Sequence, residues 1–159
     1  LVVAKTDDAY SKLIKQVMDR KFTRKYMAIV EGVFEENAGI IDAPIGRSTS
    51  DRKRLAVTSG RSKIAITKFN VLERFLEHTL LEVELQTGRT HQIRVHMAYL
   101  KHPVLGDVTY GNPHISLKHQ ALHAYKLGFF HPKTEKYMEF TAPIPEDISN
   151  VLTEFKKNR

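Results

Sequence analysis

The chain has 159 residues, 42% of them hydrophobic and 27% charged, and it contains no cysteine. This length suits one domain with a single core. No apolar run reaches the length of a membrane span, and disulfides and thiolate metal sites are excluded. The formal net charge of +7 is typical of proteins with a polyanionic partner such as a nucleic acid, and the alternative is that the lysines only keep the protein soluble. We expect a cytoplasmic protein that does not contact a membrane.

The predicted elements start with an apolar strand over residues 1–5, a composition typical of the interior of a sheet, which suggests a fragment cut inside a fold. Thr6 is placed to cap a helix that runs to about Lys21. The apolar face of this helix would combine Leu13, Ile14, Val17 and Met18. Strands are predicted at 26–30 and 40–45, with an acidic loop between them.

A basic segment, residues 46–63, follows and contains a short predicted strand at 55–57. Alternating apolar residues predict two long strands, 64–75 and 79–86, which a turn at Glu77 and His78 joins into an antiparallel pair. A helix is predicted from Thr90 to about Leu100, then a hairpin of 125–130 with 137–141, then a helix over 148–155. The strands outnumber the helices, which predicts an α+β fold with a mainly antiparallel mixed sheet flanked by helices.

The richest motif is Thr87–His96, where a predicted strand runs into a Gly-Arg turn and a helix start. Thr90 is placed to cap that helix. Two arginines and two histidines would then gather near free backbone N–H groups, a combination that suits an anion. The i, i+5 spacing of His91 and His96 does not place both on one helix face, so we expect structural or RNA-facing roles and no metal site.

Three segments together resemble the RluA-type pseudouridine synthases. They are RKYMAIVEG at 24–32, TGRTHQIRVHM at 87–97 with HPVLGD at 102–107 and Tyr110-Gly111, and LHA at 122–124 with Leu127, Phe129, His131 and Pro132. The long second segment is far more specific than a lone glycine pattern. The order and spacing of the three cover essentially the whole chain, and the basic segment looks most like the branch that acts on large-subunit ribosomal RNA.

The resemblance implies the pseudouridine synthase fold and an isomerase that converts uridine to pseudouridine in RNA without cofactor or metal. Tyr26 matches the family tyrosine that packs against the target base, and Arg94 matches the arginine that pairs with a catalytic aspartate. That aspartate belongs to a His-Arg-Leu-Asp segment placed just before the apolar strand at 1–5. We therefore expect residues 1–159 to form the catalytic domain, truncated at its N-terminus, with the aspartate upstream of Leu1.

Other carboxylates are weaker candidates for the nucleophile. Asp7 and Asp8 fall in the first turn of a helix, where a helix-dipole role is expected, and Asp107 sits in a turn, where it would cap backbone amides. Residues 1–159 alone should therefore bind RNA without isomerising uridine. An RNA-binding domain with no activity remains the alternative function.

Several basic residues are predicted to contact RNA, most of them through phosphates. They are Arg24, Arg47, Arg52, Lys53, Arg54, Arg89 and His91. The alternative for the basic segment is a solvated loop, and Arg89 could instead tie the turn. Ribosomal RNA is the expected partner, with transfer RNA as a second candidate, and we expect a monomer.

Overall fold

The computed structural model describes residues 1–158, and its centre is a six-stranded sheet in the order β2-β6-β7-β1-β8-β9. These strands are β1 (Thr23–Glu31), β2 (Ala38–Asp42), β6 (Ile66–Arg74), β7 (His78–Leu85), β8 (Leu122–Phe130) and β9 (Tyr137–Thr141). A second sheet, in the order β4-β3-β5, contains β3 (Ile45–Arg47), β4 (Leu55–Val57) and β5 (Ser62–Lys63). All strand pairs within these two sheets are antiparallel.

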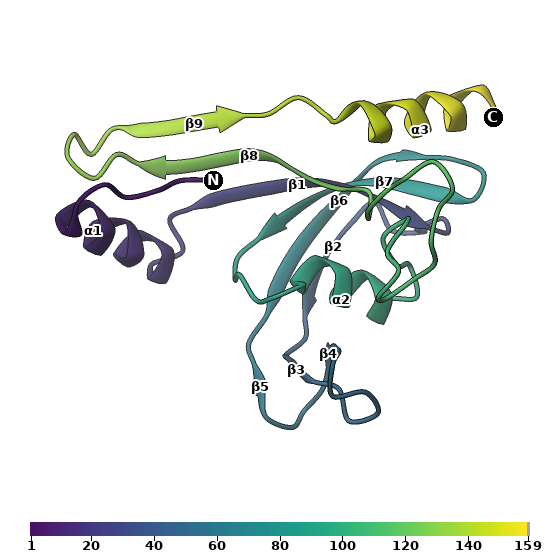
Figure 1. Cartoon of the computed structure of the whole chain (residues 1–159), viewed down its shortest axis with the longest axis horizontal. Coiled ribbons are helices and arrows are strands. Elements are labelled where there is room, and N and C mark those ends of the chain that lie inside the picture. The colour runs from purple at the N-terminus through teal and green to yellow at the C-terminus, as the bar shows by residue number, and fades with distance from the viewer. Residues whose placement is uncertain (159) are drawn as a thin grey trace.

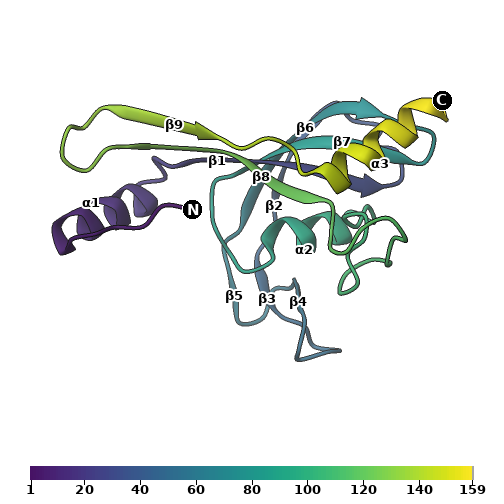
Figure 2. The same ribbon diagram turned by 45° about the horizontal axis from the view of Figure 1, so that its top comes forward.

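The alternation of β1 and β7 gives the large sheet two apolar faces, each covered by a helix. On one face, Ala28, Val30, Leu81 and Val83 join a core with Ile93 of α2 (Gln92–Tyr99). On the other face, a separate core of buried residues holds α3 (Glu146–Lys157). Figures 1 and 2 show α2 on one side of the sheet, with β3, β4 and β5 beyond it, and α3 near the end formed by β6 and β7. The α+β prediction is confirmed.

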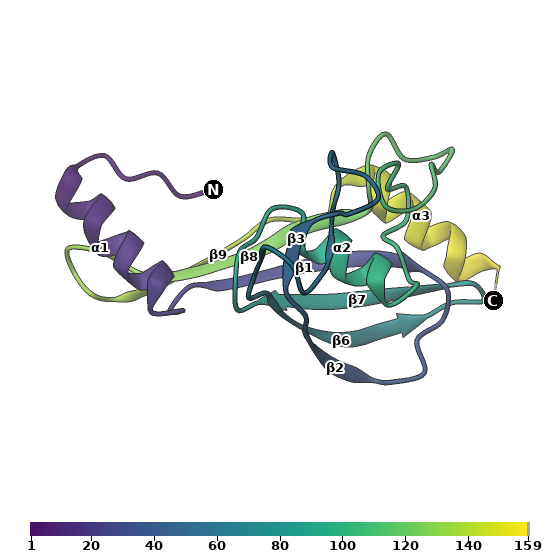
Figure 3. The same cartoon turned by 90° about the horizontal axis from the view of Figure 1, so that it is seen from below.

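The first helix, α1 (Asp7–Met18), lies beside the turn that joins β8 to β9, at the opposite end of the sheet from α3 (Figures 1 and 3). The Thr6 cap is confirmed, since the Thr6 hydroxyl accepts the Ala9 N–H at 3.2 Å. Gln16 holds the helix to Phe130 through two hydrogen bonds of 2.8 Å. Three helix residues that we expected on a buried face are instead exposed: Ile14, Val17 and Met18.

Several predicted boundaries were wrong for identifiable reasons. Residues 1–4 form no strand, because no neighbouring strand pairs with them, and Leu1 and Val3 are exposed. The α1 helix ends at Met18 rather than near Lys21. The single strand expected at 40–45 is divided into β2 and β3 on either side of Pro44, which has no N–H to donate. The long strand expected from residue 64 begins at Ile66, and His78 lies in β7 rather than in the turn.

None of the helices within residues 1–158 has the length and apolarity needed to cross a membrane.

Candidate active site

The turn before α2 is built around the side chain of Gln92, which is 2% exposed. Its Oε1 accepts the Thr87 hydroxyl at 2.8 Å and the Arg89 N–H at 2.9 Å. Its Nε2 donates to Ile66 O at 3.0 Å and to the Thr67 hydroxyl at 2.9 Å. All four bonding positions of the amide are used, so Gln92 fixes the turn against β6.

The predicted Thr90 cap is therefore wrong. The N-cap of α2 is His91, which has φ 55° and makes no side-chain capping bond. The Arg89 N–H, one of the groups that a bound anion would have used, is already satisfied by Gln92. The helix start is thus a rigid turn held by a buried amide, and the anion-binding potential of this region rests on side chains.

Arg94 projects from α2 toward the loop that follows it, where it meets Asp107. Its Nε donates to Asp107 Oδ2 at 2.6 Å and its Nη2 donates to Oδ1 at 2.7 Å. The Arg94 side chain is 12% exposed and the Asp107 side chain is 0% exposed. This is a bidentate and largely desolvated ion pair. Sequence reasoning missed this partner for Arg94, which we had expected to face a carboxylate outside the chain.

Asp107 also caps the loop, as predicted, because its Oδ1 accepts the N–H groups of Thr109 at 2.9 Å and Tyr110 at 3.1 Å. Burial alone raises the pKa of the Asp107 carboxyl, but the bonds from Arg94 and the two amides outweigh it and hold that pKa below its usual value. A fully buried carboxylate with four bonds cannot reach a ribose or a base. Asp107 therefore orients Arg94 and does not act as a nucleophile.

Tyr110 lies against both Arg94 and His91. The Arg94 Cζ is 5.0 Å from the centre of the Tyr110 ring, within the range of a cation–π contact. The Tyr110 hydroxyl is 3.1 Å from His91 Nδ1. Partial burial and the charge of Arg94 lower the pKa of His91. Sequence reasoning gave Tyr110 no role, although it stands in the Tyr-Gly pair of the long motif.

Tyr26 lies in β1, half-buried, and packs against the core that contains Ile93 of α2. It follows an irregularity in the pairing of β1 with β8, between Lys25 and Tyr26. No hydrogen bond joins Tyr26 to Arg94 within the described residues. The structure thus places the two predicted catalytic residues on the same face of the sheet, and their roles stay predictions.

The Arg24 side chain lies beside Gly88 of the Thr87–His96 motif. A Cβ on Gly88 would lie 2.6 Å from Arg24 Nη1, so the glycine leaves room for the guanidinium. The Arg24 Nε is buried and has no hydrogen-bond partner within the described residues. The RNA contact expected of Arg24 stays a prediction.

Two other motif residues have defined contacts. Arg89 is exposed and its Nε donates to Ile64 O at 2.9 Å, so it ties the turn while its terminal nitrogens remain available to RNA. His96 is fully buried, with Nε2 2.9 Å from Ala43 O and Nδ1 2.9 Å from the Thr67 hydroxyl. His96 is therefore structural, and no group of His, Asp and Glu residues within 1–158 could hold a metal ion.

The basic hairpin, which we define as residues 45–63, carries the remaining predicted RNA contacts. Its exposed basic residues are Arg47, Arg52, Lys53, Arg54, Arg61 and Lys63. The tip is ordered by its own bonds, including Arg47 Nη1 to Arg52 O at 3.2 Å and Arg54 to Asp51 at 3.3 Å. The hairpin is thus a folded projection, and Arg54 is the one tip cation that already has a carboxylate partner among the described residues.

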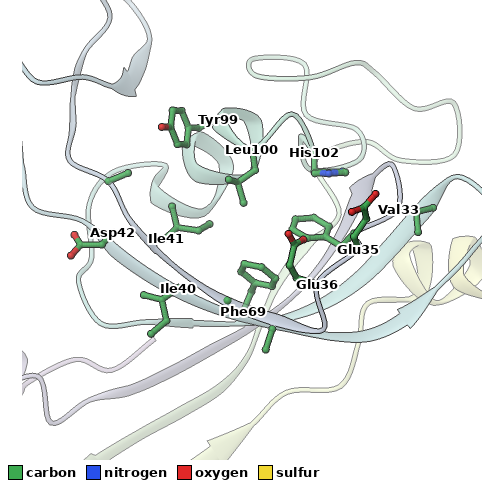
Figure 4. Close-up of a pocket in the computed structure, with 14 residues that line it drawn as sticks. Val33, Glu35, Glu36, Ile40, Ile41, Asp42, Phe69, Tyr99, Leu100 and His102 are labelled. Carbon is green, nitrogen blue, oxygen red and sulfur yellow. The ribbon is translucent and has the colours of Figure 1, made fainter.

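A concavity lies elsewhere, beside the edge strand β2 and the C-terminal end of α2 (Figure 4). It measures about 630 Å³, and its apolar floor includes Ile41 and Phe69. Three carboxylates line it: Glu35, Glu36 and Asp42. Since these charges repel phosphates, RNA is not expected here.

Comparison with known protein families identifies the family of this chain. The family model described as RNA pseudouridylate synthase matches residues 1–99. The chain belongs to this family. Together with relatives named ribosomal large subunit pseudouridine synthase D, this match confirms the resemblance to RluA-type enzymes, and the matched range includes Tyr26, Arg94 and the basic hairpin.

Curated relatives extend the match over nearly all of the chain. An uncharacterized RNA pseudouridine synthase of Bacillus subtilis, YlyB, is 50% identical over 159 residues, covering 99% of this chain and 52% of the relative. Ribosomal large subunit pseudouridine synthase D of Vibrio cholerae is 46% identical over 162 residues, covering 93% and 49%. The chain therefore spans about half the length of the curated relatives it matches.

A solved structure supports the fold. Human RNA pseudouridylate synthase domain containing 1 superposes with a TM-score of 0.75 at 24% identity, covering 97% of this chain and 74% of the human chain.

Proposed function

We propose that the protein to which this chain belongs is an RNA pseudouridine synthase that isomerises uridine in large-subunit ribosomal RNA. The observation that carries the proposal is Arg94, which stands in the family motif with its guanidinium held rigidly by a buried carboxylate. The names of the relatives support ribosomal RNA as the substrate. We also propose that the protein acts as a monomer in the cytoplasm, and transfer RNA is the second substrate candidate.

The reaction breaks the C1′–N1 bond of the uridine, rotates the freed uracil and joins its C5 to C1′, after which C5 loses its proton and N1 gains one. Tyr26 offers a flat ring against which an unstacked base can pack, and its hydroxyl can exchange a proton. Arg94 Nη1 has no partner within the described residues, so it can bond a further carboxylate. We propose that this carboxylate is the aspartate of a His-Arg-Leu-Asp segment immediately before Leu1.

The RNA substrate is a polyanion, so positively charged side chains can hold it beside these groups. The hairpin cations, together with Arg24 and Arg89, are the proposed phosphate contacts, which would position RNA without reading its sequence. The net charge of +7 is consistent with such a surface.

The test uses the full-length gene product and a ribosomal RNA transcript that lacks modifications. Pseudouridine is measured by carbodiimide labelling and primer extension, or by mass spectrometry of nucleosides. We expect the wild type to form pseudouridine and Arg94→Ala to form none, while the RNA dissociation constant changes by less than about threefold.

Lys12→Ala is a matched control, because Lys12 lies on α1 in an exposed pair with Asp8, far from Arg94. It should retain full activity. If the wild-type gene product binds the transcript but forms no pseudouridine, the inactive RNA-binding domain is the correct function. If Arg94→Ala retains activity and loses RNA affinity, Arg94 binds RNA and has no catalytic role.

A further inference from the structure

Tyr110 lies where the loop after α2, the start of α2 and the basic hairpin meet. Its backbone N–H donates to Asp107 Oδ1 at 3.1 Å, which fixes the residue to the carboxylate that also holds Arg94. Its ring packs in the small core of Ile45, Ala65 and Val95, together with Leu55 and Val57 of the hairpin. The hydroxyl of the side chain therefore contacts the hairpin, which we propose binds RNA. The ring contacts Arg94, which we propose takes part in the chemical step.

The hydroxyl end binds the hairpin. It accepts the Leu55 N–H of β4 at 3.3 Å and lies 3.1 Å from His91 Nδ1. A hydroxyl that accepts from Leu55 still has its own proton to donate to His91. Among residues 1–158, the Leu55–Tyr110 bond is the one hydrogen bond that links the basic hairpin to α2 or to the loop at 101–111.

The ring end binds Arg94. The Arg94 guanidinium has its edge on Asp107, through two bonds of 2.6 and 2.7 Å, and its Cζ lies over the Tyr110 ring, 5.0 Å from the ring centre. The bidentate contact with Asp107 and the packing of the Tyr110 ring beside Cζ together restrict the direction of the guanidinium. Nη1 therefore points in one direction.

We propose that Tyr110 is a positioning residue that holds the basic hairpin at a fixed distance and orientation relative to the Arg94 guanidinium. Its hydroxyl serves RNA binding, and its ring serves the chemical step. A phosphate bound at the hairpin tip then lies at a set distance from Arg94, which brings the target uridine into register with the catalytic groups. The inference rests on the proposed function.

The test separates the two ends of the side chain in the full-length gene product. Tyr110→Phe removes only the hydroxyl, so we expect KM and the RNA dissociation constant to rise about fivefold, the factor typical of one net hydrogen bond. The kcat should change by less than about twofold. Tyr110→Leu also removes the ring, so kcat should fall about tenfold, in the range of a lost cation–π contact.

Tyr137→Phe is the matched control. Tyr137 lies in the hairpin of β8 and β9, and its hydroxyl donates to the Thr23 hydroxyl at 3.0 Å. The substitution therefore also removes one hydrogen-bonded tyrosine hydroxyl. All three constants should stay at the wild-type values. The positioning role is refuted if Tyr110→Phe lowers kcat as much as Tyr110→Leu does, or if Tyr110→Phe changes none of the constants.

Limited proteolysis measures the docking of the hairpin without catalysis, so its outcome can be told apart from failure of the proposed function. Trypsin cuts after the exposed basic residues Arg52, Lys53 and Arg54 when the hairpin loosens. We expect Tyr110→Phe to raise the cleavage rate at these sites about fivefold and Tyr137→Phe to leave it unchanged. Equal cleavage of Tyr110→Phe and wild type overturns the docking role of the hydroxyl, whether or not the protein forms pseudouridine.

Discussion

The Arg94–Asp107 pair can be tested by Asp107→Asn, which keeps the shape of the side chain and removes its charge. Removing one partner of a buried ion pair typically costs 3–5 kcal/mol, because the other charge stays desolvated and unpaired. The Asp107 side chain is 0% exposed and that of Arg94 12% exposed, so this range applies. Asparagine retains one oxygen for the amides of Thr109 and Tyr110, which favours the low end, about 3 kcal/mol.

For a domain of this size, each kcal/mol lowers the midpoint of thermal unfolding by about 2–4 °C. We therefore expect Asp107→Asn to lower it by about 6–12 °C at pH 7, measured by circular dichroism. Asp51→Asn is the matched control, since Asp51 forms a solvent-exposed pair with Arg54, and such pairs contribute less than about 1 kcal/mol. Equal shifts for the two variants would refute the buried pair.

The pH dependence gives a second check on the same pair. The pKa of Asp107 is lowered in the folded state, so its contribution is complete above the unfolded pKa of about 3.9 and is lost as the pH falls toward the folded pKa. The difference in unfolding free energy between wild type and Asp107→Asn should be constant above about pH 5 and shrink below about pH 4. A difference that grows in acid would contradict the assigned ion pair.

Three further predictions follow from other contacts. Replacing Arg52, Lys53 and Arg54 by alanine should flatten the salt dependence of RNA binding by about two units of slope, because Arg54 is already paired with Asp51, and an unchanged slope would make the hairpin a solvated loop. Burial lowers the pKa of His96, so the stability it contributes is complete above about pH 6.5 and is lost as the pH falls below that value; urea titrations should show this loss in the wild type and not in His96→Gln. Residues 1–159 alone should bind ribosomal RNA in a filter assay and form no pseudouridine, and any pseudouridine formed would disprove the need for an upstream aspartate.

The elements that sequence analysis predicted well are those whose signals are local. The alternation in β6 and β7 reflects two apolar faces of one sheet, and both strands were found to within two residues. The Thr6 cap needs only a hydroxyl three residues before the Ala9 N–H. Thr90 offers the same local pattern, yet the helix begins elsewhere because Gln92 is bound to Ile66 and Thr67, which local spacing cannot reveal.

The site was predicted only in part, because sequence patterns report local contacts and the site also depends on tertiary contacts. The long motif identified Arg94 from its place among neighbours, while its partner Asp107 lies 13 residues later, beyond the end of α2 and in a turn. The capping role of Asp107 was visible in that turn, because it concerns amides two and three residues away. The ion pair depends on how the loop folds back onto α2, a tertiary contact that no periodicity encodes.

The Arg94–Asp107 pair also changes the part that Arg94 can play in the proposed reaction. A free guanidinium would lower the pKa of an approaching carboxylate through its full positive charge. In this structure that charge is already balanced by Asp107, so a second carboxylate at Nη1 would gain hydrogen bonds and little net attraction. Arg94 therefore contributes mainly direction to a nucleophilic aspartate. Because Asp107 and the Tyr110 ring supply that direction, Asp107→Asn and Tyr110→Leu should reduce kcat even though neither residue touches the uridine.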